Sequence, residues 1–184
     1  MNLRAWSRFE STVRLRDCST LPFLCGQPEV RKVSDDERPC GLYRTTVPTL
    51  DGIQADRLVY YHNHGDPGPG VYYPERWVNN RAVFSEQGHT IPSLDYAMSL
   101  DPLPKEGFYK VEARFHCCEK KCREFKFGEL VQLGYNGGAD PILFLPGYRG
   151  ERFELPETGI PVRREALNYL EPLSIQSTDD PRRD

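Results

Sequence analysis

The sequence predicts a mainly β fold of the α+β class, in which antiparallel sheets or a small barrel are accompanied by two short helices. Three observations lead to this fold class. Short apolar runs alternate with polar residues at a period of two, which is typical of strands with one buried face. Fifteen glycines and sixteen prolines in 184 residues separate these runs, and both residue types end helices and strands. Helical spacing is confined to two short segments.

The first half of the chain carries short predicted strands joined by turn residues. These strands are 9–16, 57–62, 71–73 and 81–84. Asn79-Asn80 offers a turn before the last of them. We expect Ser93 to cap a short helix through Leu100, because its hydroxyl can accept a hydrogen bond from an unpaired amide of the first turn. Pro102 and Pro104 then stop this helix.

The clearest predicted strand covers 107–117, where apolar residues face one way and charged residues the other. After it, strands 130–133 and 141–145 flank the turn Asn136-Gly137-Gly138, whose residue types tolerate the positive φ of tight hairpins. The remaining predicted elements are a hairpin through 147–150, a helical turn at 164–170 and a closing strand at Ser174-Ile175.

Three regions follow from this order. We expect an irregular β-rich segment with one short helix at 1–127, a small barrel-like β unit at 128–175 that shares the same core, and a flexible tail at 176–184.

The barrel-like unit ends with Gly159-Ile160-Pro161, a short helical turn containing Asn168-Tyr169-Leu170, and a last strand. This order resembles a Src-homology-3-like small barrel. The resemblance covers residues 128–175 and implies a compact β barrel. Six residues separate Pro161 from Asn168, whereas the family places its proline and Asn-Tyr pair almost side by side, so no polyproline-binding groove is carried over.

Composition narrows the possible partners. No apolar run approaches the roughly 20 residues that cross a bilayer, so a membrane is not an expected partner. The net charge of −3 gives no general attraction for phosphate, and nucleic acid is likewise not expected. Arg4 and Arg8 interrupt the apolar residues at the N-terminus, which favours a cytoplasmic location over secretion. In that compartment the six cysteines are expected as free thiols or metal ligands.

The segment 116–122 contains the first candidate metal ligands, His116, Cys118 and Cys122. Thiolates separated by two to four residues can bind one zinc ion, and a neighbouring imidazole can add a ligand. A closed site needs four ligands, and no second Cys-x-x-Cys motif supplies them. From elsewhere in the chain, the set could be completed only by Cys18, Cys25, Cys40 or the pair His62 and His64. The alternative is that Cys117 is a small buried apolar residue and the others are loop residues.

A second candidate metal site is the pair His62 and His64. On a strand, residues i and i+2 project to the same side, so both imidazoles could hold one catalytic metal ion. Asp66, Glu75 or His89 could supply a third ligand. The alternative is a rigid Pro/Gly loop whose histidines hydrogen-bond to its own carbonyl groups.

A third candidate is a protein-binding surface made of Tyr72, Tyr73, Arg76 and Trp77. Tyrosine, tryptophan and arginine supply most of the binding free energy at protein interfaces. The same aromatic residues are also common in cores, so the alternative is that they fill the interior.

No nucleotide-binding or serine-nucleophile motif occurs. The sequence therefore favours a non-catalytic protein-binding module of the adaptor or immunity/inhibitor type, whose partner is another protein and which needs no cofactor. The alternative is a metalloprotein, with a structural zinc site at Cys118 and Cys122 or a catalytic site at His62 and His64.

Overall fold

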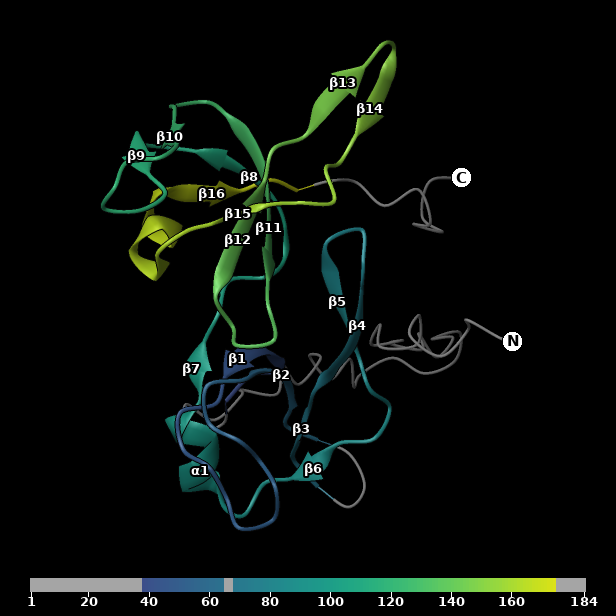
Figure 1. The fold of residues 1–184 in the computed structure, drawn as a ribbon. Coiled ribbons are helices and arrows are strands. Elements are labelled where there is room, and N and C mark those ends of the chain that lie inside the picture. The colour runs from purple at the N-terminus through teal and green to yellow at the C-terminus, as the bar shows by residue number, and fades with distance from the viewer. Residues whose placement is uncertain (1–37, 65–67, 175–184) are drawn as a thin grey trace, which may run out of the picture. The chain divides into compact units, whose positions relative to one another are not determined.

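The computed structural model describes residues 38–64 and 68–174, all of which belong to the unit Asp36–Asp184. The strand expected at 9–16 and the tail expected at 176–184 lie outside the described residues. The described part is mainly β, with antiparallel sheets and two short helices, which confirms the predicted fold class (Figure 1).

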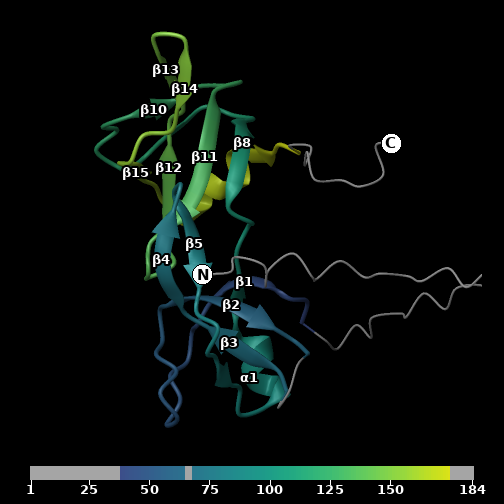
Figure 2. The ribbon, with the colours of Figure 1, turned by 90° about the vertical axis from the view of Figure 1, so that its right-hand side faces the viewer.

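The first sheet is formed by residues 41–102. Its strands are β1 (Gly41–Arg44), β2 (Leu58–His62), β3 (Gly70–Tyr72), β6 (His89–Thr90) and β7 (Asp101–Pro102). They are antiparallel and follow the order β6-β3-β2-β1-β7. The helix α1 (Leu94–Ser99) lies beside this sheet in both views (Figures 1 and 2). As predicted, the Ser93 hydroxyl caps it, accepting a hydrogen bond of 3.2 Å from the Tyr96 amide.

The central strand β2 has apolar residues on both faces. Val59 and Tyr61 belong to a core cluster that includes the α1 residues Tyr96 and Ala97. Leu58 on the opposite face belongs to a second, larger core cluster. Because successive side chains point to opposite faces of a strand, an unbroken apolar run is what a strand covered on both sides requires.

A hairpin of β4 (Pro74–Val78) and β5 (Arg81–Phe84) follows the third strand of this sheet. Asn79 and Asn80 have φ values of 50° and 64°, which confirms the predicted tight turn. The Asn80 side chain donates to Gln132 Oε1 at 3.0 Å, and Gln132 Nε2 donates to the Asn79 carbonyl at 2.8 Å. The buried Gln132 therefore links this turn by hydrogen bonds to β11 (Leu130–Tyr135), a strand of the second sheet.

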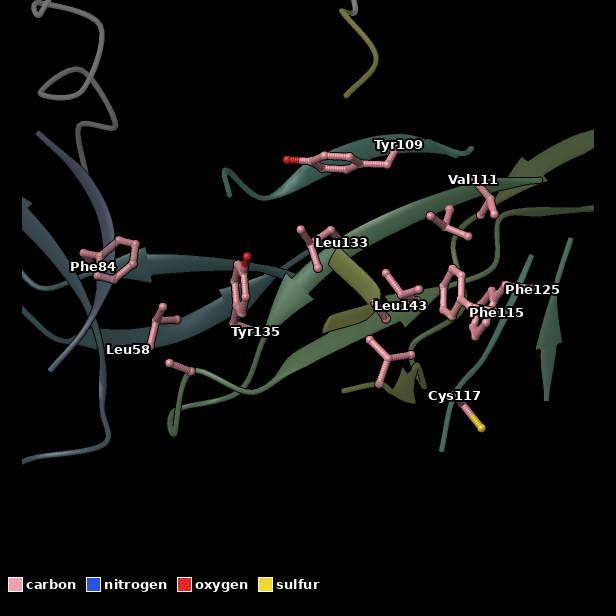
Figure 3. Packing of buried hydrophobic residues seen from close by; sticks show 14 residues of the cluster. Leu58, Phe84, Tyr109, Val111, Phe115, Cys117, Phe125, Leu133, Tyr135 and Leu143 are labelled. Carbon is pink, nitrogen blue, oxygen red and sulfur yellow. The ribbon is translucent and has the colours of Figure 1, made fainter. Parts of the chain in front are cut away.

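The second sheet has the order β15-β12-β11-β8-β16. Its strands are β8 (Gly107–Val111), β11 (Leu130–Tyr135), β12 (Pro141–Phe144), β15 (Ile160–Pro161) and β16 (Leu170–Pro172). Figure 3 shows the larger core cluster along β11 and β12, where Leu133 and Leu143 are fully buried. The sheet is open at both edge strands and does not close into a barrel within the described ranges, so the likeness to a Src-homology-3-like barrel stays a prediction.

The strand expected over 107–117 is divided in two, which corrects the prediction. β8 ends at Val111, and β9 (Phe115–His116) pairs with β10 (Glu124–Phe125) instead of with the second sheet. The burial alternation is interrupted at Ala113, which is exposed, and resumes at Phe115 and Cys117, where the hydrogen-bonding partner has changed. The apolar periodicity of a segment indicates which of its faces can be buried, but not which strand it pairs with.

The last elements agree closely with the prediction. They are the hairpin β13 (Gly147–Arg149) and β14 (Arg152–Glu154) and the 3₁₀ helix η2 (Arg164–Tyr169). The closing strand is β16 rather than Ser174-Ile175, and Ile175 lies outside the described residues. In the part of the chain that the structure describes, no helix combines the length and apolar character needed to cross a membrane.

Candidate metal centre at Cys40, His62 and His64

Cys40, His62 and His64 come together at one end of the first sheet. Gly41 pairs with Tyr61 in the β1–β2 ladder, so the preceding Cys40 stands opposite the following residue, His62. Residues that face each other across an antiparallel pair project from the same face. His64 lies two residues beyond His62, which returns it to the same side of the chain.

The ligand atoms of these three residues lie within 4.8 Å of one another. Cys40 Sγ is 3.9 Å from His62 Nδ1 and 3.7 Å from His64 Nδ1. Around a tetrahedral zinc ion, bond lengths of about 2.3 Å to sulfur and 2.05 Å to nitrogen place the two atoms about 3.6 Å apart. The observed spacing is therefore close to the spacing that zinc requires.

Asn63 lies between the two histidines and organises the cluster. Its main-chain N–H donates to Cys40 Sγ at 3.3 Å, and its side-chain oxygen accepts from that thiol at 3.0 Å. Its side-chain nitrogen donates to the Arg38 carbonyl at 3.0 Å, which fixes the amide. The main-chain N–H would also support a thiolate at Cys40 when a metal is bound, whereas the side-chain oxygen accepts only from the protonated thiol.

The two imidazole rings are in edge contact, with centroids 4.1 Å apart. Burial, followed by the neighbouring His64, lowers the pKa of His62 below its ordinary value of 6.5. His62 is therefore neutral at pH 7, which is the form that binds metal. The His64 main-chain N–H donates to His62 Nδ1 at 3.3 Å. A metal ion at that nitrogen would replace this hydrogen bond.

The sequence singled out His62 and His64 and offered Asp66, Glu75 or His89 as a third ligand, whereas the residue that the structure brings to the two histidines is Cys40. His89 lies in β6 with its ring against Tyr73, at a centroid distance of 5.5 Å, and Asp66 lies outside the described residues. Within 38–64 and 68–174, the set of Cys40, His62 and His64 is the one group of three ligands with this spacing. The sequence did not connect Cys40 with these histidines, because apolar periodicity does not show that the strand after Cys40 pairs with β2.

The predicted ligands of the segment 116–122 are only partly assembled. Cys118 Sγ lies 3.6 Å from Cys122 Sγ. His116 does not join them as a third ligand within 4.8 Å. Two thiols without further ligands fall short of the four that a structural zinc site needs.

The predicted binding residues divide between core and surface. Tyr72 packs against the larger core cluster. Tyr73 and Trp77 line a surface hollow of about 340 Å³. Arg57 also lines this hollow, whereas Arg76 does not. The Trp77 indole N–H donates to the Tyr135 carbonyl at 2.8 Å, which fixes the ring while 43% of the residue stays exposed.

The chain matches no known protein family, no curated protein and no solved structure in the comparisons made.

Proposed function

We propose that this protein binds zinc through Cys40, His62 and His64. The observation that carries the proposal is the spacing of the three ligand atoms, all within 4.8 Å of one another. One thiolate and two neutral imidazoles form a ligand set that suits zinc better than magnesium or calcium, which prefer oxygen ligands.

Three protein ligands leave a fourth zinc position for water or a substrate. Sites of this composition are typical of catalytic rather than structural zinc, because structural sites are closed by four protein ligands. His64 is exposed while Cys40 and His62 are half-buried, so the fourth position would be reached from the solvent side. Bound zinc would supply Lewis acidity, and the protein would supply the orientation of the ligands through Asn63.

Cobalt substitution tests this proposal directly. Co²⁺ added to the metal-free full chain should give the near-ultraviolet absorption of a thiolate–cobalt bond, and Zn²⁺ should displace it. Cys40→Ser should abolish that absorption, and His62→Asn should weaken binding. His116→Ala is the matched control, because His116 was the other predicted histidine ligand and lies in β9.

Circular dichroism and thermal melting should show that each variant is folded, so that lost binding reflects lost ligands. Unchanged cobalt absorption in Cys40→Ser would overturn the proposed site. Loss of the absorption in His116→Ala alone would move the metal to the segment 116–122.

A second candidate function is recognition of another protein at the hollow beside Trp77. The observation that favours it is the exposed indole held in place by its hydrogen bond to Tyr135, with Tyr73 and Arg57 in the same lining. Rigid aromatic side chains and arginine are the residue types from which interface hot spots are built.

A photo-crosslinking residue in place of Gln54, which also lines the hollow, would identify such a partner. The partner should then bind the purified chain, and Trp77→Ala should weaken binding by roughly 2 kcal/mol or more. Val78→Ala in the same strand is the control, because Val78 is similarly exposed but does not line the hollow. Equal affinity of the two variants would argue against this surface.

We also propose a cytoplasmic location. The cysteines of the described ranges are free, as is usual in a reducing compartment. Fractionation of cells that produce the full chain would test this location.

A further inference from the structure

The turn between β9 and β10 places three thiols in a row. Cys118 Sγ lies 3.5 Å from Cys117 Sγ and 3.6 Å from Cys122 Sγ. The Lys121 amide donates to the Cys118 carbonyl at 3.0 Å, and Lys121 has a φ of 52°. This tight turn reverses the chain, so that Cys118 and Cys122 face each other.

We propose that Cys118 and Cys122 form a thiol-oxidation site, at which a hydroperoxide converts the pair into a reversible disulfide. The two sulfur atoms need to approach from 3.6 Å to a bond length of about 2.05 Å. Rotation about the side-chain bonds of Cys118 and Cys122 can supply this movement, because Cys122 is exposed and Cys118 is half-buried.

Cys117 is not the favoured partner of Cys118. Its side chain is 4% exposed and lies next to Phe115 and Phe125 at the edge of the larger core cluster (Figure 3). A disulfide between sequence neighbours would also close a small ring through a planar trans peptide bond. Cys117 instead supplies an S–H donor toward Cys118.

The surroundings of Cys118 support a thiolate at this position. Hydrogen bonds from the Cys122 main chain, and then from the Cys117 and Cys122 side chains, lower the pKa of Cys118 to about 7. The pKa of Cys122 is raised, first by its hydrogen bond to Cys118. The thiolate is the nucleophilic form, so Cys118 is the residue that attacks.

The reaction proceeds in two balanced steps. The Cys118 thiolate attacks one oxygen of hydrogen peroxide, a sulfur–oxygen bond forms, the oxygen–oxygen bond breaks, and the leaving hydroxide takes a proton to become water. The Cys122 sulfur then attacks the sulfenic sulfur of Cys118, a disulfide forms, and the hydroxyl leaves with the Cys122 proton as a second water. The two thiols lose two electrons, and the peroxide gains them.

Peptide mapping of the full chain tests the site. Trypsin cuts after Lys120 and Lys121, so a Cys118–Cys122 bridge joins two peptides that are otherwise separate. Brief treatment with hydrogen peroxide should produce this linked pair, and dithiothreitol should release it. At pH 7, Cys118 should react faster than Cys122, because the pKa of Cys118 is lowered and that of Cys122 is raised, and reactivity follows the thiolate fraction.

Three single variants distinguish the roles of Cys117, Cys118 and Cys122. Cys122→Ser should accumulate a sulfenic acid at Cys118 that dimedone traps, Cys118→Ser should form no bridge, and Cys117→Ser should still form it. Cobalt binding should survive all three, whereas Cys40→Ser should lose cobalt and keep the disulfide. A bridge to Cys117, or oxidation of Cys122 in Cys118→Ser as fast as that of Cys118 in Cys122→Ser, would overturn the proposal.

Discussion

Cys40 and His62 lie opposite each other at the end of the β1–β2 ladder, with Cys40 Sγ 3.9 Å from His62 Nδ1. The residues are 22 positions apart in the sequence, so their approach depends on the register of these two strands. The proposed metal site and the first sheet therefore stabilise each other.

Zinc should raise the thermal stability of the full chain through this coupling. A ligand that binds only the folded state, at 100 times its Kd, adds about 2.7 kcal/mol to the free energy of unfolding. Differential scanning fluorimetry with and without Zn²⁺ measures the shift in Tm. Cys40→Ser should remove the shift, and a shift of equal size in that variant would contradict the proposed ligands.

The reactivity of Cys118 should change near neutral pH. Its pKa is lowered to about 7 by hydrogen bonds from the Cys122 main chain and from the neighbouring thiols, so the thiolate forms as the pH rises through 7. Alkylation by iodoacetamide, followed by mass spectrometry, should show a half-maximal rate near that pH.

Cys122→Ala should move this midpoint to higher pH, because it removes one S–H donor and keeps the main-chain N–H. An unchanged midpoint would mean that the Cys122 side chain does not support the thiolate.

Glu106 should make stability depend on pH in the direction opposite to that of an ordinary ion pair. Its carboxyl is buried, and burial raises its pKa above 4.5, although a hydrogen bond of 2.9 Å from the Ala82 amide and the charge of Arg81 oppose this. The unfolded carboxyl loses its proton near pH 4.5 and the folded carboxyl only at a higher pH. The wild type therefore loses stability as the pH rises from 4.5 through the folded pKa, and above that pH the loss is constant.

Glu106→Gln keeps an oxygen to accept from Ala82 and removes the charge. Urea unfolding from pH 4.5 to 7.5 should show the variant gaining stability relative to the wild type as the pH increases. A difference that does not change with pH would refute the assignment.

Gly134 should not tolerate a side chain. A Cβ atom at this position would collide with the main-chain oxygen of Asn80 and come within 3.2 Å of the Phe144 ring. Gly134→Ala should therefore lower the free energy of unfolding by about 1–3 kcal/mol, the usual cost of overpacking. Urea unfolding measures the effect. Gly147→Ala is the control, because nothing lies within 4 Å of its added Cβ, and its stability should stay within about 0.5 kcal/mol of the wild type.

Local chemistry made much of this fold predictable. The Ser93 cap and the Asn79-Asn80 turn each depend on a side chain or backbone preference within a few residues, and both occur as predicted. At the turn after β11 the prediction succeeded for a partly different reason. Asn136 Oδ1 accepts from the amides of Gly138 and Asp140, while the positive φ of 62° falls on Ala139.

Non-local pairing limited the prediction of the candidate site. His62 and His64 lie two residues apart in one segment, so the sequence alone predicted that their side chains share one side of the chain. Cys40 required knowledge that β1 pairs with β2 in a particular register, and no local pattern contains it. The same reason explains why the division between β8 and β9 was missed, since the apolar alternation runs through it unchanged.

The strand β2 contributes one side of its apolar run to each of the two core clusters, with Val59 and Tyr61 in one and Leu58 in the other. A gene truncated on either side of this strand would consequently encode a fragment with an uncovered apolar face, prone to aggregation. The described part of the chain is thus poorly suited to dissection into separately expressed pieces, and fusion partners or tags belong beyond it.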